Sequence, residues 1–414
     1  MAIPLTWQAN TRDESHRWKV LGVGVAANAS FSAASAGIPT TAVWLRSGYH
    51  LGNAELGLVL GAMGLGVALS ELPWGMLTDR WGDRPVLLTG LLATAAALLA
   101  MALFLVPSAE LAVPALGWLV AGMCLTGLVG GSVNGSSGRA VMAWFREGER
   151  GLAMSIRQTA VPLGGGLGAL MLPWLAASHG FAAVYGVLAA MCAVSGAFAW
   201  RWLHEPPPAH AAASASHAPK PQADPLRDAR IWRVVLGIGI LCSPQMAVLT
   251  FATVFLHDAA HLGIAAISGT MAAVQTGAMA MRVWSGRFTD RRGNRRAYLR
   301  GSTLVAAASF VVLALAVRAV GDASGALLMA LVAVAGICVS AWHGVAYTEL
   351  ATLAGTARAG TALGMANTAV YAGLFITPLA IPHVLAAGSW GTVWLVAGLC
   401  ALCAFPLFPK PQRP

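Results

Sequence analysis

Two ionisable residues, Glu71 and Arg282, stand inside long apolar stretches, and each precedes a loop aspartate, Asp79 or Asp290, by eight residues. Eight residues of α-helix span about 12 Å, so both side chains are expected at the same depth below a helix end. A buried carboxyl group can exchange a proton, and a guanidinium binds a carboxylate through two hydrogen bonds. The pair therefore predicts proton coupling at Glu71 and anion binding at Arg282. Charges that only pack helices or close a gate are the alternative.

Four further polar side chains in apolar stretches are candidate substrate contacts: Arg157, His343, Asn28 and Gln245. Arg157 fits a second anion contact or a partner of an inner gate. His343 fits a substrate contact or proton relay, or a neutral histidine bonded within the protein. Asn28 and Gln245 lie at plausible cavity depth, where hydrogen bonds between helices are the alternative.

Membrane-spanning helices are needed to position these residues. Of 414 residues, 57% are apolar and 10% charged, against roughly 25% charged in soluble proteins. A membrane-spanning helix needs about 20 apolar residues. The composition therefore excludes a soluble enzyme, a nucleic-acid module and a disordered chain. Apolar runs predict twelve spans, at residues 20–45, 54–77, 85–106, 113–142, 152–176, 180–202, 231–256, 264–288, 298–318, 324–350, 361–386 and 389–408.

The spans divide into an N-terminal half, 1–203, and a C-terminal half, 230–414, each with six helices. Residues 204–229 between them are rich in Pro, Ala, Ser and His, which predicts a flexible cytoplasmic linker. If both termini are cytoplasmic, 21 of the 26 Lys and Arg residues fall on that side and only Arg46 and Arg318 on the other. This bias predicts a multi-pass protein of the cell (inner) membrane with both termini cytoplasmic. Because the charges are spread over many loops, they indicate contact with lipid headgroups and not with nucleic acid.

The two halves repeat each other in sequence. A shift of 211 residues lays GMLTDRWGDR at 75–84 on GRFTDRRGNR at 286–295, and a shift of 209 lays Thr159-Ala-Val on Thr368-Ala-Val. Glycines in these loops permit close helix approach, and the aspartates can pair with arginines or a helix N-terminus. We expect two gate loops that hold an inner gate closed, with topogenic charge and a turn as the simpler interpretation. Their residues are Gly75, Asp79, Arg80, Gly82 and Arg84, and Gly286, Asp290, Arg291, Gly293 and Arg295.

These loops resemble the G-x-x-x-D-R-x-G-R-R pattern of the major facilitator superfamily, and the resemblance covers the whole chain. Asp83 departs from the pattern, where a basic residue is usual. The resemblance implies an all-α integral membrane fold with twelve transmembrane helices in two parallel-repeat six-helix bundles. It also implies alternating access by rocking of the halves. Arg282-Val-Trp-Ser-Gly286 resembles the R-x-x-x-G stretch of the monocarboxylate-transporter branch, where the arginine binds the substrate carboxylate.

The expected function is secondary active transport of a small organic anion, monocarboxylate-like and proton-coupled. Proton-driven efflux of drugs or hydrophobic metabolites is the alternative, since Pro162-Leu-Gly-Gly-Gly166 partly resembles an antiporter signature. The spans contain no H-E-x-x-H or G-x-S-x-G motif, so we expect no enzyme. All six cysteines lie in apolar stretches and are expected to be buried thiols. No cofactor and no metal are expected; the partners are the small-molecule substrate, protons and membrane lipid, and the protein is expected to be a monomer.

Overall fold

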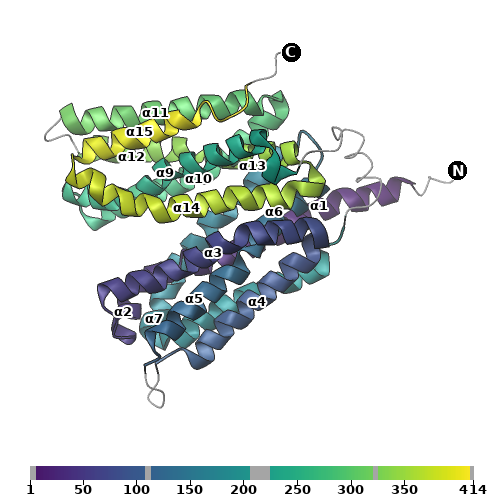
Figure 1. Cartoon of the computed structure of the whole chain (residues 1–414), viewed down its shortest axis with the longest axis horizontal. Coiled ribbons are helices and arrows are strands. Elements are labelled where there is room, and N and C mark those ends of the chain that lie inside the picture. The colour runs from purple at the N-terminus through teal and green to yellow at the C-terminus, as the bar shows by residue number, and fades with distance from the viewer. Residues whose placement is uncertain (1–5, 108–112, 206–223, 320–324, 411–414) are drawn as a thin grey trace. The chain divides into compact units, whose positions relative to one another are not determined.

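The computed structural model of the chain describes residues 6–107, 113–205, 224–319 and 325–410 (Figure 1). Within these residues the secondary structure is helical and contains no strand. The all-α fold predicted from the apolar runs is therefore confirmed. Most of the predicted linker, residues 206–223, lies outside the described residues.

The first six predicted spans are present with small changes at their ends. The first span is broken near Pro39, the fourth is divided at Gly131, and the fifth and sixth form one helix that bends at Gly180 (φ 73°). The helices are α1 (Thr6–Ser35), η1 (Ile38–Thr41), α2 (Ala42–Gly48), α3 (Asn53–Trp81), α4 (Asp83–Phe104), α5 (Leu116–Gly130), α6 (Ser132–Trp144) and α7 (Arg150–Trp202).

The second six spans follow the same plan. The tenth span is divided at Ala341 and Trp342, next to Ser340, which corresponds to Gly131 in the first half. The helices are η2 (Pro225–Arg227), α9 (Ala229–Asp258), α10 (Ile264–Arg292), α11 (Arg295–Ala319), α12 (Gly325–Ser340), α13 (His343–Ala354), η3 (Thr356–Arg358), α14 (Ala359–Ala386) and α15 (Trp390–Ala404).

The repeat is also visible in the backbone. Among the described residues, His50 and His261 are the non-glycine residues with positive φ, at 53° and 50°. They occupy equivalent loops, 211 positions apart. Positive φ is uncommon outside glycine, so the shared conformation indicates that both halves make the same turn before their second helix.

Length and composition suit these helices to a bilayer. Nine helical stretches of the described residues are long and apolar enough to cross a membrane, and one of them, Arg150–Trp202, covers two predicted spans. The remaining two spans are α10, which carries several charges, and α15, which has 15 residues. Large apolar side chains face outward, including Leu170 (81% exposed), Phe104 (71%) and Trp118 (68%). Such exposure is favourable in lipid, whereas in water it would promote aggregation.

The chain folds into two compact units that differ from the two sequence halves. The first unit contains residues 1–147, 157–222 and 354–368, and the second contains 148–156, 223–353 and 369–414. The start of α14 therefore packs with the first unit and the start of α7 with the second. Each half of the sequence lends one short segment to the unit built mainly by the other.

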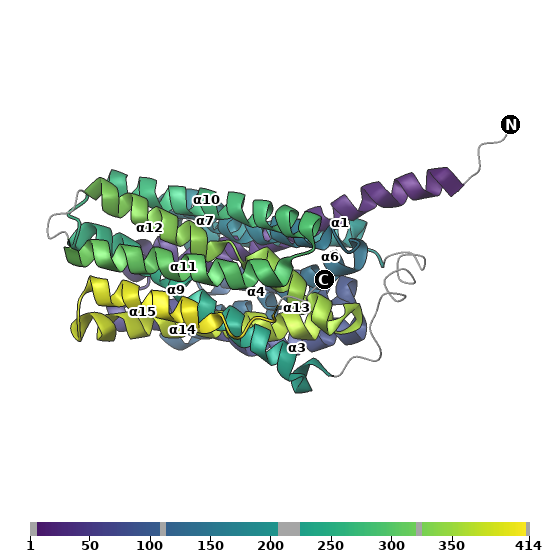
Figure 2. The same cartoon turned by 90° about the horizontal axis from the view of Figure 1, so that it is seen from above.

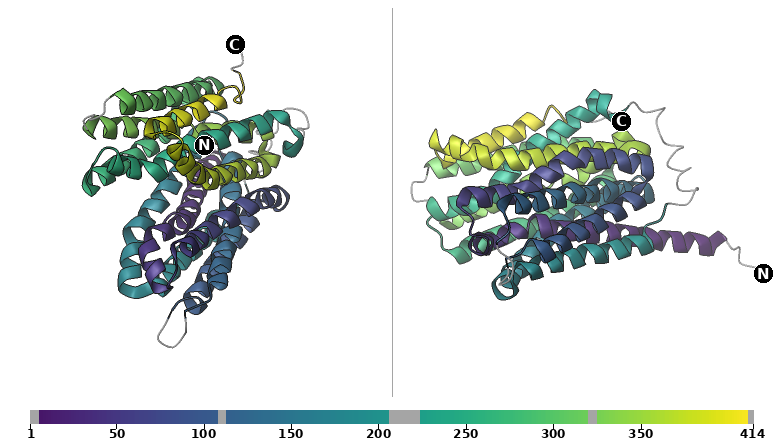
Figure 3. Two further views of the ribbon diagram at one scale, coloured as in Figure 1. Left: turned by 60° about the vertical axis from the view of Figure 1, so that its left-hand side comes forward. Right: turned by 60° about the horizontal axis from the view of Figure 1, so that its bottom comes forward.

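Each unit has its own apolar core. In the first, α3 packs along α5 (Figure 1), and the Tyr49 hydroxyl donates to the Leu105 carbonyl at 2.6 Å beneath the Phe181 ring. In the second, α11 and α15, green and yellow in Figures 2 and 3, lie side by side. There Trp394 stacks on Phe310 with ring centroids 6.2 Å apart.

Candidate functional site

The Glu71 carboxylate lies on α3 in the first unit and is fully buried. It accepts hydrogen bonds from two neutral amides, Asn134 Nδ2 of α6 at 2.6 Å and Asn367 Nδ2 of α14 at 3.1 Å. Buried charges require such partners because an unpaired carboxylate loses its hydration. Glu71 is thus bonded both to a helix of its own half and to the α14 segment from the other half.

Arg157 and Asn28 meet at a shared serine. Arg157 on α7 is 1% exposed, and its Nη1 donates to Ser137 Oγ at 3.0 Å. Asn28 Nδ2 donates to the same oxygen at 2.9 Å and to the Gly24 carbonyl at 2.8 Å. Arg157 is also close enough to Glu71 for an electrostatic interaction. The structure therefore brings Glu71, Arg157 and Asn28 into one polar cluster, in which Asn28 joins helices.

Arg282 occupies the equivalent place in the second unit. It lies on α10, is 4% exposed, and has Cys242, Tyr347 and His343 as electrostatic neighbours. Arg282 and His343, which are neighbours in the second unit, correspond in the repeat to Glu71 and Asn134, which are bonded in the first unit. One duplicated position thus holds an acid with an amide, and the other holds a base with an imidazole.

His343 begins α13 and is held firmly. Its Nδ1 lies 3.2 Å from the Ser340 carbonyl, which can only accept, so Nδ1 carries the proton. The ring stacks on Trp342 with centroids 3.8 Å apart. Gln245 on α9 is 4% exposed, and its Oε1 has no hydrogen-bond partner among the described residues. An unfilled buried acceptor is uncommon in proteins and marks a place where a donor can bind.

The first gate loop caps a helix from the other half of the sequence. The Asp79 carboxylate accepts from the backbone N–H groups of Gly360 at 2.8 Å and Thr361 at 2.7 Å, in the first turn of α14. We call this contact the first cap. A carboxylate is favoured there because the first N–H groups of a helix lack internal partners and carry partial positive charge.

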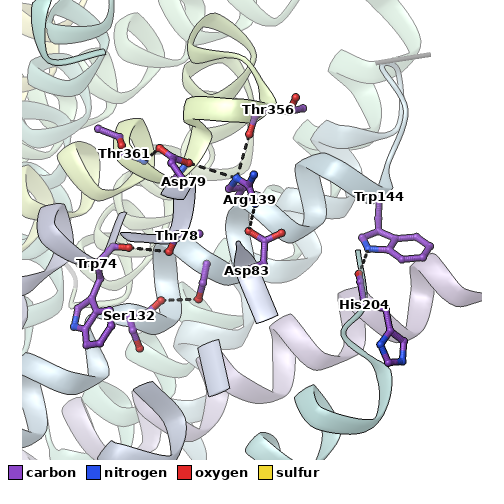
Figure 4. Close-up of polar contacts among 12 residues, drawn as sticks. Trp74, Thr78, Asp79, Asp83, Ser132, Arg139, Trp144, His204, Thr356 and Thr361 are labelled. Carbon is purple, nitrogen blue, oxygen red and sulfur yellow. Dashed lines mark hydrogen bonds and ion pairs between the residues drawn. The ribbon is translucent and has the colours of Figure 1, made fainter. Parts of the chain in front are cut away.

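Arg139 on α6 reinforces the first cap (Figure 4). Its Nε lies 3.4 Å from Asp79, its Nη1 donates to Asp83 at 2.8 Å, and its Nε also donates to the Thr356 carbonyl at 3.2 Å. Asp83, the residue that departs from the family pattern, is thus a partner for Arg139. A basic residue at 83 would repel this guanidinium.

The second gate loop repeats the capping contact. The Asp290 carboxylate accepts from the backbone N–H groups of Gly151 at 3.0 Å and Leu152 at 2.7 Å, at the start of α7. We call this the second cap. The glycine before each aspartate is explained by close approach: a Cβ at Gly75 would collide with the Gly360 carbonyl, and one at Gly286 with the Gly151 carbonyl.

The remaining gate-loop residues lie beside the caps. Gly82 (φ 89°) and Gly293 (φ 62°) end α3 and α10 in conformations that favour glycine. Arg84 donates to the Trp200 carbonyl at 2.9 Å and Arg295 to Thr352 Oγ1 at 3.1 Å. The other two arginines of the loops, Arg80 and Arg291, are exposed.

Four residues of these polar clusters, Asn367, Arg139, Asp83 and Asn134, were not among the predicted site residues. Asn367 gives no signal, since a lone amide in an apolar span is common. Arg139 and Asp83 lie 56 positions apart, and only the deviation of Asp83 from the family pattern marks them. Asn134 was recognisable as the repeat mate of His343, and that symmetry was a usable signal.

An all-helical fold of duplicated halves, apolar faces and a few buried charges is expected of a secondary transporter. The sequence profile of the Major Facilitator Superfamily matches residues 24–320 and 284–414. The chain belongs to this superfamily, as its gate loops predicted. It is also 31% identical, over 95% of its length and 85% of the relative's, to an uncharacterized MFS-type transporter found in two strains of Mycobacterium tuberculosis.

Solved structures agree on the fold. A proton:xylose symporter bound to 6-bromo-6-deoxy-D-glucose gives a TM-score of 0.75 at 16% identity, covering 95% of each chain. A fucose:proton symporter in the outward conformation gives 0.69 at 14% identity, covering 94% of this chain and 97% of the other. At these identities the likeness concerns the fold alone.

Proposed function

We propose that this transporter couples protons to the movement of a small organic anion of the monocarboxylate class. The observation that carries the proposal is Glu71, a fully buried carboxylate held by amides from two helices. Inside a membrane protein such a group is by default a candidate functional site, and proton relays are one of its common roles. The symport named for the xylose and fucose proteins is consistent with this coupling but comes from the fold only.

Protonation of Glu71 changes what it can hold. As a carboxylate it accepts hydrogen bonds from both Asn134 and Asn367. As an acid it carries an O–H group on one oxygen, and the hydrogen bond that an amide N–H donates to that oxygen becomes weaker. Asn367 lies in the same α14 segment that Asp79 caps at Gly360 and Thr361. Proton binding therefore loosens the start of α14, and it also removes the attraction between Glu71 and Arg157.

Arg282 is the proposed anion contact. Its guanidinium is buried beside Tyr347, Cys242 and His343. None of these residue types is ordinarily a carrier of negative charge at neutral pH. A substrate carboxylate would bind the guanidinium bidentately, and the open Gln245 Oε1 could accept from a hydroxyl or amide donor of the substrate. A neutral sugar offers no anionic group to the guanidinium, which disfavours sugars as cargo.

The caps belong to the proposed cycle as closing contacts. We assign them to the cytoplasmic side of the inner membrane, because the basic residues that predict both termini inside gather at the same helix ends. Closed caps then correspond to an outward-facing protein. Loosening at Glu71, together with an anion on Arg282, releases the caps and opens the inner side.

The test is uptake of radiolabelled lactate into proteoliposomes by Arg282→Lys. Lysine keeps the charge but loses the planar fork, so uptake should fall at least about tenfold. Arg287→Lys, an exposed arginine on the same helix, is the matched control and should transport normally. Undiminished lactate uptake by a folded Arg282→Lys protein would remove the anion assignment. Efflux of lipophilic cations without lactate uptake would favour drug export instead.

A further inference from the structure

A cluster of arginines lines a small cavity in the second unit, and Arg282 is not among the lining residues. We propose that this cavity binds the phosphate headgroup of an anionic phospholipid. The cavity encloses about 180 Å³ and is lined by Arg230, Arg233, Arg296, Leu353, Leu407 and Pro409. That volume is far above the roughly 10–15 Å³ that a single water needs, so the cavity has room for a hydrated phosphate group.

The lining residues come from helix ends that meet at one level. Arg230 and Arg233 lie in the first turns of α9, and Arg296 is the second residue of α11. Leu353 lies at the end of α13, and Leu407 and Pro409 follow α15. Two helices thus begin at the cavity, and their N-termini add partial positive charge to that of the arginines.

The arginines keep charge available for a ligand. Arg296 pairs with Glu349 at 2.6 Å, and Arg230 pairs with Asp228 at 2.8 Å. The Arg230 side chain is 73% exposed, and ion pairs in water are weak enough for a phosphate to compete. Arg233 donates to the Pro406 carbonyl at 2.7 Å, and no carboxylate of the described residues forms an ion pair with it.

The surroundings favour a lipid over a soluble phosphate. The cavity lies where the candidate membrane spans Ala229–Ala252, Arg295–Arg318 and Gly325–Ala354 begin or end. The ends of membrane spans are expected at the level of the lipid headgroups. Leucine and proline form its remaining wall, and the neighbouring Trp232 is 41% exposed. An exposed tryptophan at a span end suits the membrane interface, and basic pockets between span ends suit acidic headgroups.

The proposal is tested by native mass spectrometry of the full chain titrated with dioleoyl phosphatidylglycerol and, separately, dioleoyl phosphatidylcholine. The wild-type protein should bind one phosphatidylglycerol more tightly than phosphatidylcholine. In the double variant Arg230→Gln/Arg233→Gln this affinity should fall about 25-fold, since each arginine near a headgroup contributes about fivefold. Arg227→Gln, an exposed arginine of η2 that does not line the cavity, should bind as the wild type does.

Three outcomes decide the matter. If the double variant fails to fold, Arg233→Gln alone is used, with about a fivefold loss expected. Equal phosphatidylglycerol affinity in variant and wild type would overturn the site. Glycerol 3-phosphate carries the same phosphate without acyl chains; if it displaced the bound lipid at equal concentration, the cavity would belong to a soluble phosphate, which would overturn the lipid assignment.

Discussion

At the scale of single residues, the few charges inside the helices are all provided with polar neighbours. Glu71 has two amides and nearby Arg157, and Arg282 has a histidine, a tyrosine and a thiol. Burying such groups opposes folding unless their partners are in place. Glu71 and Arg282 occupy equivalent positions of the duplicated chain, and we propose that they serve transport and not stability.

The amide of Asn367 should be measurable in stability. Asn367→Ala leaves the buried Glu71 carboxylate with one donor fewer, which should cost about 1–3 kcal/mol. The melting temperature of the purified protein in detergent reports this loss. Thr368→Ala is the matched control, because the Thr368 hydroxyl is buried without a hydrogen-bond partner among the described residues. Equal melting temperatures for the two variants would show that the amide does not hold Glu71.

At the scale of helices, the two caps are similar but unequal. Both place an aspartate on two backbone N–H groups in the first turn of a helix. The first is reinforced by Arg139, which also binds Asp83 and the Thr356 carbonyl. At the position corresponding to Arg139, the second half has Thr348, whose hydroxyl lies 3.4 Å from the Arg150 carbonyl and 2.7 Å from that of Gly344. The first cap is therefore expected to be the stronger one.

Hydrogen–deuterium exchange tests the caps directly. Asp79→Asn removes the charge that holds Gly360 and Thr361 and its attraction to Arg139, so these amides should exchange about tenfold faster or more. Asp290→Asn should accelerate Gly151 and Leu152 by a smaller factor. Asp228→Asn, a cap outside both gate loops, should leave the four amides unchanged. If Asp79→Asn exchanged at the wild-type rate there, the first cap would not stabilise the start of α14.

At the scale of the whole molecule, the sequence was sufficient for the architecture. The spans and the gate loops are local sequence patterns, and because the two halves repeat each other, each pattern occurs twice in the chain. The hydrogen bonds of Glu71 could not be predicted, because Asn134 and Asn367 lie 63 and 296 positions away, although the repeat marks Asn134 as the counterpart of His343. Helices that are apolar on all sides give no periodicity from which to read the inward face. The exchange of residues 148–156 and 354–368 between units depends on the same long-range packing.

Proton coupling at Glu71 is the central claim, and proton movement is its most direct measure. Proteoliposomes loaded with a pH-sensitive dye are given external lactate, with protein-free liposomes correcting for passive entry of lactic acid. The wild-type protein and Glu55→Gln, which changes an exposed acid at the other end of α3, should acidify the lumen. Glu71→Gln should exchange labelled lactate for unlabelled lactate across the membrane but move no protons, since the amide mimics the protonated acid. Lactate-driven acidification by Glu71→Gln at the wild-type rate would contradict the account.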